Sequence, residues 1–167
     1  QVVRLCLKSR LVITALAICS DLLIPDHKAD AYRNDLLAKY PSASRSPLDN
    51  AVLWITKAFT RWDAQYFLAI AHENRYVEDQ MLAFFPMFPL VIRHLALAFQ
   101  QFLLNVFVVQ INLLSSLLIV SYLTNVIAFT LAGWFLFRLT HLICHSQPTS
   151  LRVVEFFAFN PASIFFT

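Results

Sequence analysis

The longest apolar stretch of the chain, from Met81 to Cys144, carries only two formal charges, Arg93 and Arg138. One membrane-spanning helix needs about 20 apolar residues, so this stretch is about three times that length. The whole sequence is 59% hydrophobic and 14% charged, whereas soluble domains are about half apolar and about a quarter charged. We therefore predict an all-α, multispanning integral membrane protein, with a soluble helical core as the alternative.

A first span is predicted over residues 5–24, with Arg4, Lys8 and Arg10 at its start. Long basic side chains can reach the membrane surface from inside a span. A signal peptide begins in a similar way, but no small-residue cleavage site follows here. The positive-inside rule then places the N-terminus in the cytosol. Residues 25–85 form a loop on the other side, which in a eukaryotic cell is the lumen of the endoplasmic reticulum.

Inside this lumenal loop, the sequence predicts one amphipathic helix that begins near Ser46. Ser46, Pro47 and Asp49 form a capping-box start. Apolar residues follow in steps of three and four, as on one face of a helix: Leu48, Val52, Ile55, Phe59, Trp62, Tyr66 and Ala69. A helix with such a stripe, a basic polar side and a tryptophan is typical of a membrane interface.

This helix is not predicted to cross the membrane, because Lys57, Arg61 and Asp63 lie along it. Each would cost roughly 2.5–3.5 kcal/mol at the centre of a bilayer. We expect Asp63 instead at the boundary between water and lipid, where its carboxylate can meet a lipid head group. Ordinary interfacial polar residues are the other interpretation of Arg61 and Asp63.

Further spans are predicted over residues 86–104, 115–140 and 153–167. Pro86 and Pro89 are expected to delay a regular helix until the second proline is passed. Arg93 and His94 fall near the middle of the first of these spans, where polar residues normally face neighbouring helices or a cavity. The simplest interpretation is a satisfied polar pair inside a helix bundle.

The apolar run over residues 102–143 is long enough for two spans, and its weakest points are residues 110–112 and 124–125. An interfacial or cytosolic helix over about 101–114, followed by one long span over 115–140, fits as well, and we prefer this second arrangement. This arrangement puts Arg138, His141 and Arg152 in the lumen, against the positive-inside tendency. The sequence "HSQPTS" is predicted to be a loop before the last apolar segment.

Several functions are excluded or left without support by residue usage. The net charge of +3 comes from scattered residues, so no phosphate-tracking stripe for nucleic acid is present. Three isolated cysteines indicate neither a zinc site nor a disulfide framework. One glycine cannot supply a Gly-rich nucleotide-binding loop. The pair His141 and His145 has helical spacing but lacks a third metal ligand, so no metal site is predicted.

The sequence begins with Gln1 and stops within an apolar run. We interpret it as an incomplete N-terminal part of one transmembrane domain. Its chemistry-bearing residues gather in the lumenal loop, where an enzyme acting on lipid-linked substrates needs an acid or base, a cation and aromatic side chains. That loop contains Arg61, Trp62, Asp63, Gln65, Tyr66, His72, Glu73, Glu78 and Asp79, and it closes with "FFPMFP".

Two motifs in this region resemble a known family. The sequence "RWDAQYFLAIAHENRY", then "AFFPMFPL" and later "FNPASIFF" are similar to the N-terminal third of the Pig-V family, the second mannosyltransferases of GPI-anchor synthesis. The resemblance covers most of the chain from about Leu48. The Trp-Asp-Ala and Phe-Phe-Pro-x-Phe-Pro motifs are fairly specific as a pair. The resemblance implies a helical bundle of the GT-C glycosyltransferase type, embedded in the endoplasmic reticulum membrane.

The resemblance also implies a reaction and a site. Mannose would pass from dolichyl-phosphate mannose to the GPI glycolipid precursor as its second mannose, with no metal and no other cofactor. Asp63 would be the catalytic residue, as the general base toward the acceptor hydroxyl or by orienting that hydroxyl, in an inverting displacement. The expected substrate-binding residues are Arg61, Trp62, Gln65, Tyr66, Pro86, Phe88, Pro89, Asn160 and Pro161. Membrane lipids, and a further membrane subunit, are the expected partners.

The chain also departs from the family pattern. Gln65 stands where an acidic residue is expected, Met87 replaces the usual glycine between the prolines, and "AHENRY" is about one residue longer than its counterpart. These differences are interpreted either as variation between lineages or as a change in activity. The alternative function is a non-catalytic membrane subunit or a transporter bundle, with Arg93 and His94 lining its interior.

Overall fold

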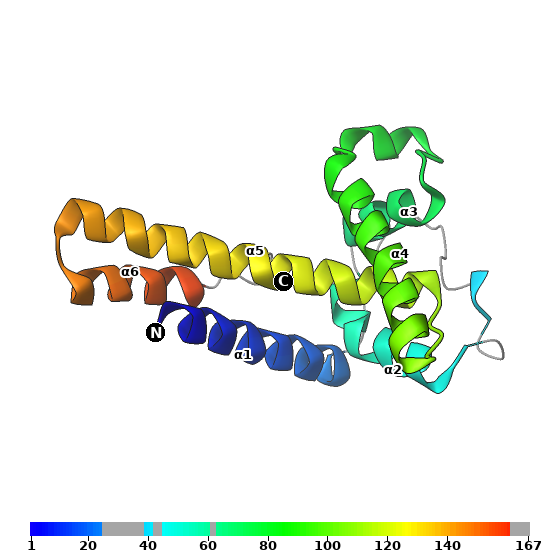
Figure 1. Cartoon of the computed structure of the whole chain (residues 1–167), viewed down its shortest axis with the longest axis horizontal. Coiled ribbons are helices and arrows are strands. Elements are labelled where there is room, and N and C mark those ends of the chain that lie inside the picture. Colours follow the sequence, from blue (N-terminus) through cyan, green and yellow to red (C-terminus); the bar gives the residue numbers. More distant parts are fainter. Residues whose placement is uncertain (25–38, 42–44, 61–62, 161–167) are drawn as a thin grey trace. The chain divides into compact units, whose positions relative to one another are not determined.

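A computed structural model describes residues 1–24, 39–41, 45–60 and 63–160. Every regular element in this part of the chain is helical. Figure 1 shows these elements in chain order. They are α1 (Val2–Leu23), α2 (Pro47–Thr56), the 3-10 helix η3 (Lys57–Phe59), α3 (Asp63–Glu73), the 3-10 helix η4 (Asp79–Ala83), α4 (Met87–Phe107), α5 (Leu113–Cys144) and α6 (Gln147–Ala158).

Two of the described helices, α4 and α5, are long and apolar enough to cross a membrane. At 1.5 Å per residue, their 21 and 32 residues give lengths of about 31 Å and about 48 Å. Both exceed the roughly 30 Å hydrocarbon core of a bilayer. Helix α1 covers the predicted first span, whereas most of the predicted last span, from Pro161 onward, lies outside the described residues.

The predicted start of α2 is confirmed in detail. Ser46 is the N-cap, its side chain accepts a hydrogen bond from the Asp49 backbone N–H at 3.0 Å, and Pro47 occupies the first turn. The Ser46 backbone N–H donates to Asp49 Oδ2 at 3.2 Å, which completes the capping box. Such caps stabilise a helix by about 1 kcal/mol.

The prediction of one continuous helix from Ser46 to Ala69 is wrong, because the helix breaks near Thr60. The Thr60 backbone N–H and hydroxyl both bond back to the Lys57 carbonyl, at 3.3 and 3.0 Å. This closes η3, and a new helix, α3, begins at Asp63. The apolar spacing continues in register across the break, so Val52, Tyr66 and Ala69 are buried on both sides of it.

Helix α4 begins at Met87, before the second proline, so the expected delay until Pro89 is wrong. Pro89 fits because it lies in the first turn, where its missing N–H has no helical partner to lose. The helix continues to Phe107 and ends at Val108, whose φ of 55° is left-handed. A separate helix over 101–114 is therefore wrong, and the break falls at residues 108–112.

The sequence "HSQPTS" is not the predicted loop, since α6 begins inside it at Gln147. Ser146 is the N-cap, with Pro148 in the first turn. His145, with a φ of 49°, makes the turn between α5 and α6. The proline that suggested a loop is thus a helix-start residue, which is its other common position.

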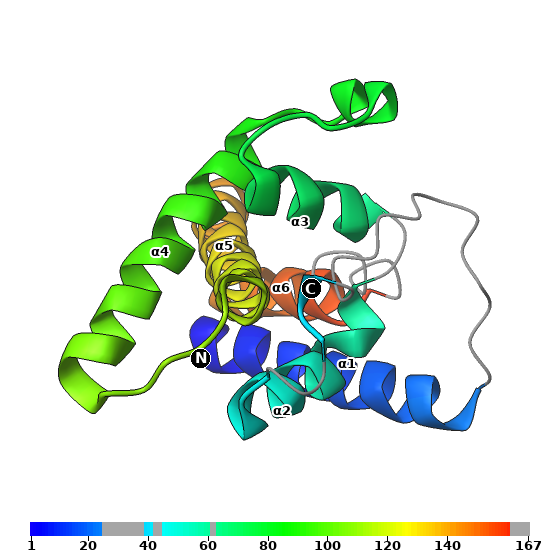
Figure 2. The ribbon, with the colours of Figure 1, turned by 90° about the vertical axis from the view of Figure 1, so that its right-hand side faces the viewer.

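The described chain forms two compact units. The unit formed by residues 21–121 has a core of side chains from α2, α3, η4, α4 and the start of α5. These are Val52, Tyr66, Leu68, Ala69, Ile70, Ala71, Met81, Ile92, Ala96, Leu114, Leu117, Leu118 and Val120. Figure 2 shows α3 beside the Met87 end of α4. This packing fixes α3, the helix that carries Asp63, Gln65 and Tyr66 of the predicted site.

The other unit, residues 1–20 and 122–167, is described up to Asn160 and has a small core of Val2, Cys6, Phe129, Val154 and Ala158. Its one glycine, Gly133, allows α1 to approach α5 closely: a Cβ at that position would lie 2.6 Å from Cys6 Sγ. Farther along α1, Thr14 Oγ1 hydrogen-bonds Tyr122 Oη at 2.8 Å. These two contacts show that α1 and α5 run antiparallel in this unit.

Arg10 is fully buried in this second unit, although it was expected to reach the membrane surface. Its guanidinium donates to the Ala158 carbonyl at 3.2 Å and lies 3.8 Å from the Phe129 ring centroid. The Ser9 hydroxyl donates to the same carbonyl. A buried cation is tolerated when hydrogen bonds and an aromatic face replace its water.

Candidate functional site

Asp63 is the first residue of α3, and its side chain is exposed. Within the described part of the chain, no hydrogen bond or ion pair holds its carboxylate. The N-terminus of a helix carries a partial positive charge that stabilises an anion placed there. The predicted acid/base residue therefore lies where its carboxylate is open to another molecule.

Of the predicted site residues next to Asp63 in sequence, the structure describes Gln65. Arg61 and Trp62 lie outside the described residues. Gln65 is half-buried, and its side-chain amide donates to the Thr60 carbonyl at 3.2 Å. This bond joins the first turn of α3 to the break before it, so Gln65 fixes the local backbone on which Asp63 stands.

Tyr66 lies one turn after Asp63 and belongs to an aromatic cluster. Its buried ring stacks on Phe84, with centroids 4.7 Å apart, and its hydroxyl donates to Gln80 Oε1 at 3.1 Å. The Phe67 ring lies edge-on to Phe84 at 5.1 Å and to Phe88 at 5.7 Å. One face of the Tyr66 ring is thus already used in packing against Phe84.

The predicted proline motif joins this aromatic cluster to α4. Pro86 is the N-cap of α4, and its carbonyl accepts from the Leu90 N–H at 3.0 Å. Pro89 is fully buried, Phe88 is half-buried and Met87 is exposed. The motif therefore places one aromatic ring against α3 and begins α4 at a fixed point. Met87, which departs from the family pattern, does not occupy the core.

The other end of α3 holds a polar network. Glu73 accepts from Lys39 and lies 2.8 Å from His72 Nδ1. A carboxylate only accepts, so Nδ1 carries the proton and, in the neutral ring, Nε2 accepts from Tyr40 Oη at 2.6 Å. Lys39, followed by His72, lowers the pKa of Glu73. Burial, and then the nearby Glu73 and Asp49, raise the pKa of Tyr40.

The lumenal cluster predicted from sequence is therefore divided. Asp63 and Glu73 lie at opposite ends of an 11-residue helix, which separates them by about 15 Å along its axis. The same distance separates Asp63 from the network around His72. Asp63, Gln65 and the aromatic cluster remain together at the predicted site, and His72 and Glu73 do not join them.

Arg93 and His94 do not form the predicted satisfied pair. The Arg93 guanidinium donates to the Ala71 and His72 carbonyls at 2.7 and 2.6 Å. These are among the last carbonyls of α3, which have no partner within their own helix. His94 lies 2.8 Å from the Leu90 carbonyl of its own helix and is exposed. The two neighbouring side chains therefore have separate roles.

Asp49 has a second role that its capping motif did not reveal. Its side chain is buried, and Oδ1 accepts from the Asn112 backbone N–H at 3.0 Å. Asn112 in turn begins α5, since its Oδ1 accepts from the Ser115 N–H at 2.7 Å. One carboxylate thus serves the N-terminal ends of two helices that lie 63 residues apart in sequence. No sequence signal pairs these residues.

Hydrogen bonds keep Asp49 charged despite its burial. Burial alone would raise the pKa of the carboxyl, but the Ser115 hydroxyl, the Asn112 N–H and Ser46 outweigh it and lower the pKa. The Ser115 hydroxyl lowers the pKa of Asp49 without forming a hydrogen bond of good geometry. The hydrogen bonds that the Asp49 carboxylate accepts from backbone come from the N–H groups of Asn112 and Ser46.

The second predicted motif lies in the other unit. Asn160 is exposed two residues after Ala158, whose carbonyl is held by Ser9 and Arg10. Pro161 lies outside the described residues. The two predicted motifs therefore belong to different units of the chain.

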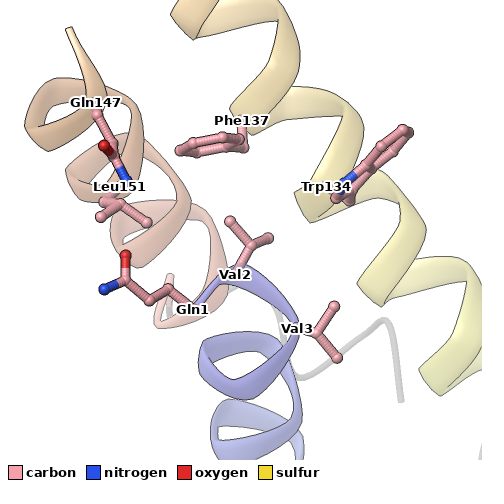
Figure 3. Close-up of a pocket in the computed structure, with 7 residues that line it drawn as sticks. All are labelled: Gln1, Val2, Val3, Trp134, Phe137, Gln147 and Leu151. Carbon is pink, nitrogen blue, oxygen red and sulfur yellow. The ribbon is translucent and has the colours of Figure 1, made fainter.

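A pocket of about 440 Å³ lies elsewhere in the same unit as Asn160. Figure 3 shows its lining, which is mainly apolar: Gln1, Val2, Val3, Trp134, Phe137, Gln147 and Leu151. It contains none of the predicted site residues. Among the described side chains, no group of three or more His, Cys, Asp or Glu residues could hold a metal ion.

Comparisons with known proteins identify relatives along the whole chain. The family model described as mannosyltransferase (PIG-V) matches residues 1–167. GPI mannosyltransferase 2 of Drosophila pseudoobscura pseudoobscura is 32% identical over 168 residues, which cover 100% of this chain and 36% of that protein. GPI alpha-1,6-mannosyltransferase 2 of Mus musculus is 34% identical, over 99% of this chain and 31% of that protein.

The human protein of the same name as the mouse relative is 33% identical, over 99% of this chain and 31% of its own length. The chain thus spans about a third of the length of the curated relatives it matches. No solved structure shows a significant match.

Proposed function

The chain belongs to the PIG-V mannosyltransferase family, and on that premise we propose that its protein transfers mannose to the GPI-anchor precursor. The donor is dolichyl-phosphate mannose, and the product carries the second mannose of the anchor. The reaction takes place at the lumenal face of the endoplasmic reticulum membrane, in a multispanning helical bundle of the GT-C type. The relatives named as GPI mannosyltransferases support this assignment.

The position of Asp63 is the observation that carries the proposal within this chain. Its carboxylate is exposed at the N-terminus of α3, next to an aromatic cluster and between predicted membrane segments. A general base must come within hydrogen-bond distance of the proton that it removes. An exposed carboxylate on a fixed helix end meets that requirement for a substrate approaching from the membrane surface.

In the proposed step, Asp63 removes the proton from the acceptor hydroxyl of the GPI glycolipid. The hydroxyl oxygen attacks the anomeric carbon of the donor mannose and forms the new C–O bond. The bond between that carbon and the phosphate oxygen breaks, and dolichyl phosphate leaves with the electron pair. The configuration at the anomeric carbon inverts, and no electron acceptor or other co-reactant is required.

The remaining site residues bind or position substrate in this proposal. Arg61 supplies a cation for the donor phosphate, and Trp62 stacks on a sugar or supports the loop. Gln65 and Tyr66 hold the α3 backbone and the aromatic cluster through the contacts described above. Pro86, Phe88 and Pro89 shape the entry to α4. Asn160 and Pro161 contribute the second motif.

We propose that neither a metal nor another cofactor takes part, because Asp63 provides the base and a basic side chain meets the leaving phosphate. Lipid-linked donor, GPI acceptor and membrane lipids are the partners, together with a further membrane subunit. The alternative of a transporter bundle lined by Arg93 gains no support, since the guanidinium of Arg93 is bonded to two backbone carbonyls of α3.

The test is rescue of cells that lack the second GPI mannosyltransferase, using the gene at its full natural length. Surface GPI-anchored protein, measured by flow cytometry, should return with the wild-type gene and not with Asp63→Ala. Asp79→Asn is the matched control, because Asp79 is also an exposed acid at the start of a helical segment of this unit. A wild-type gene that does not rescue, or full rescue by Asp63→Ala, contradicts the proposal.

A further inference from the structure

The two ends of α4 are both held by elements of the predicted lumenal loop. Near its start, Phe88 packs against Phe67 of α3, and Arg93 donates to the last carbonyls of α3. After its end, Asn112 donates to Asp49 of α2 at 3.0 Å. A helix that crosses the membrane must have its ends on opposite sides. Crossing by α4 would therefore require α2 and α3 to lie on opposite sides as well.

The segment that joins α2 to α3 opposes such a separation. It contains Lys57 and Arg61 and leads directly into Asp63. Placed at the centre of a bilayer, each of these charges would cost roughly 2.5–3.5 kcal/mol. Lys57 is instead paired with Asp21 at 3.0 Å, and about half of its side chain is exposed. The membrane therefore does not pass between α2 and α3, and both ends of α4 lie on one side.

The exposed surface of α4 carries a line of polar residues with apolar residues on both sides of it. The wider apolar stripe consists of Val91, Leu95, Phe102 and Val106, and the narrower one of Leu90, Leu97 and Leu104. The polar stripe between them consists of exposed His94, Gln101 and Asn105. A spanning helix would carry that polar stripe through the hydrocarbon, where polar groups are costly. A helix in the membrane surface can place the wider apolar stripe in lipid and the polar stripe in water.

The same arrangement sets the direction of α5. It also removes the conflict between the predicted lumenal position of Arg138 and the positive-inside rule. If α4 does not cross, α5 begins in the lumen and runs toward the cytosol. This direction agrees with its antiparallel contacts to α1, namely Gly133 against Cys6 and Tyr122 with Thr14. Arg138, His141 and Arg152 then lie on the cytosolic side, as the positive-inside rule favours.

We propose that α4 lies along the lumenal surface of the membrane, with its wider apolar stripe against the acyl chains of that leaflet, and that it does not cross. The expected span over residues 86–104 is replaced by a lipid-contacting surface. α5 becomes the helix that returns the chain to the cytosol. The proposal concerns membrane placement and does not depend on the transfer reaction.

Cysteine labelling in sealed microsomes tests the sidedness in the full-length protein with its native cysteines replaced. A maleimide that cannot cross membranes is applied before and after permeabilisation. Three exposed positions are compared: Asn50→Cys on α2, Gln110→Cys after α4, and Gln147→Cys on α6. We expect the first two to react only after permeabilisation and the third to react at once. Immediate labelling at Gln110, with protection at Gln147, would overturn the proposal.

Depth measurements test the lipid contact itself. A fluorophore attached to a cysteine at Val91, Leu95, Phe102 or Val106 is quenched by lipids that carry spin labels at defined depths. An in-plane helix gives a similar, shallow depth at all four positions, and Asn105→Cys gives weaker quenching. A steady change of depth from Val91 to Val106 would indicate a crossing helix. No quenching at any of the four would show that protein covers the stripe, which would also refute lipid as its occupant.

Both experiments can be separated from the proposed function. Labelling and quenching report sidedness and depth whether or not the protein transfers mannose. A protein that fails to rescue surface GPI-anchored protein, but shows the expected labelling, would refute the reaction and leave the placement of α4 intact.

Discussion

At the N-terminal end of α3, Asp63 presents its carboxylate to solvent, while at the C-terminal end Glu73 is bonded to Lys39 and His72. The two acids belong to one short helix and to one unit. Arg93 further ties the Glu73 end of α3 to α4 through two backbone carbonyls. At the Asp63 end, Gln65 donates to the Thr60 carbonyl and Tyr66 packs on Phe84, but among the described residues nothing bonds the Asp63 carboxylate itself.

This difference separates the chemical role of the two acids. Lys39 and His72 lower the pKa of Glu73, so its carboxylate is a weaker base, and taking up a proton would weaken both bonds. An open carboxylate at a helix start has no such cost. The Asp63 end is therefore suited to catalysis and the Glu73 end to holding the fold.

The largest expected effect comes from Asp63→Asn. The amide keeps the shape of the side chain but cannot act as a base, so mannose transfer should fall by about 100-fold to 10,000-fold. The unfolding temperature of the protein in detergent should fall only slightly, because the described part of the chain gives Asp63 no bond to lose and the exposed helix end contributes less than about 1 kcal/mol. Transfer is measured in microsomes with a labelled donor. A variant that retains most of its activity would remove the contrast between the two ends.

The sequence predicts several parts of this region correctly, because the signals are local. The Ser46–Asp49 capping box acts within one turn of helix and is predicted correctly. The prolines mark the start of α4, although the helix begins at Met87 and not after Pro89 as expected. The break at Thr60 could not be foreseen in the same way. The apolar spacing continues across it, and the bonds that close η3 involve a backbone carbonyl that no residue pattern marks.

Contacts between distant residues explain what remained hidden in the site. Asp49 meets Asn112, and His72 meets Tyr40, only after the helices have packed. The sequence suggested one cluster that included His72 and Glu73, but the length of α3 separates these residues from Asp63. The catalytic role of Asp63 and the roles of its neighbours stay predictions.

The second-largest effect is expected from Arg93→Gln, which should lower the stability of the protein. It tests whether the Glu73 end of α3 is anchored to α4 by Arg93. It replaces the charged donor of two hydrogen bonds to the Ala71 and His72 carbonyls. Hydrogen bonds to charged groups contribute about 1.5–3 kcal/mol each, and a partly buried pair on one side chain should give a combined loss of about 2 kcal/mol. Thermal unfolding in detergent measures it, with Arg93→Lys as the milder control. Equal stability of the wild type and Arg93→Gln would show that this end is not anchored by Arg93.

Asp49→Ala should have a somewhat smaller effect on stability. It removes the reciprocal half of the α2 capping box, the bond from the Ser46 N–H, and leaves the Asn112 N–H without its acceptor. The lost half of the capping box costs less than a whole N-cap, which is worth about 1 kcal/mol. The unsatisfied buried donor adds about 1 kcal/mol, so the total stays below about 2 kcal/mol. Asp49→Asn, which keeps one side-chain oxygen, should recover part of the loss. Both variants should retain the Asp63-dependent reaction in proportion to the folded protein. A selective loss of transfer with normal stability would instead connect Asp49 to the chemistry.

The smallest effect is expected from Glu73→Gln, and its pH dependence identifies the cause. Lys39 and His72 lower the pKa of Glu73 in the folded protein from its ordinary value of 4.5. A carboxyl with a depressed pKa stabilises the fold above its unfolded pKa, and this contribution is lost as pH falls through the lower, folded value. The Lys39 side chain is 40% exposed, so solvent screens the pair and the contribution should stay below about 1 kcal/mol.

The free energies of unfolding of the wild type and Glu73→Gln should therefore differ at pH 7 and converge below pH 4.5, with Tyr40 and His72 unchanged in both proteins. If the difference instead grows as the pH falls, the network at this end of α3 does not stabilise the fold through the Glu73 carboxylate.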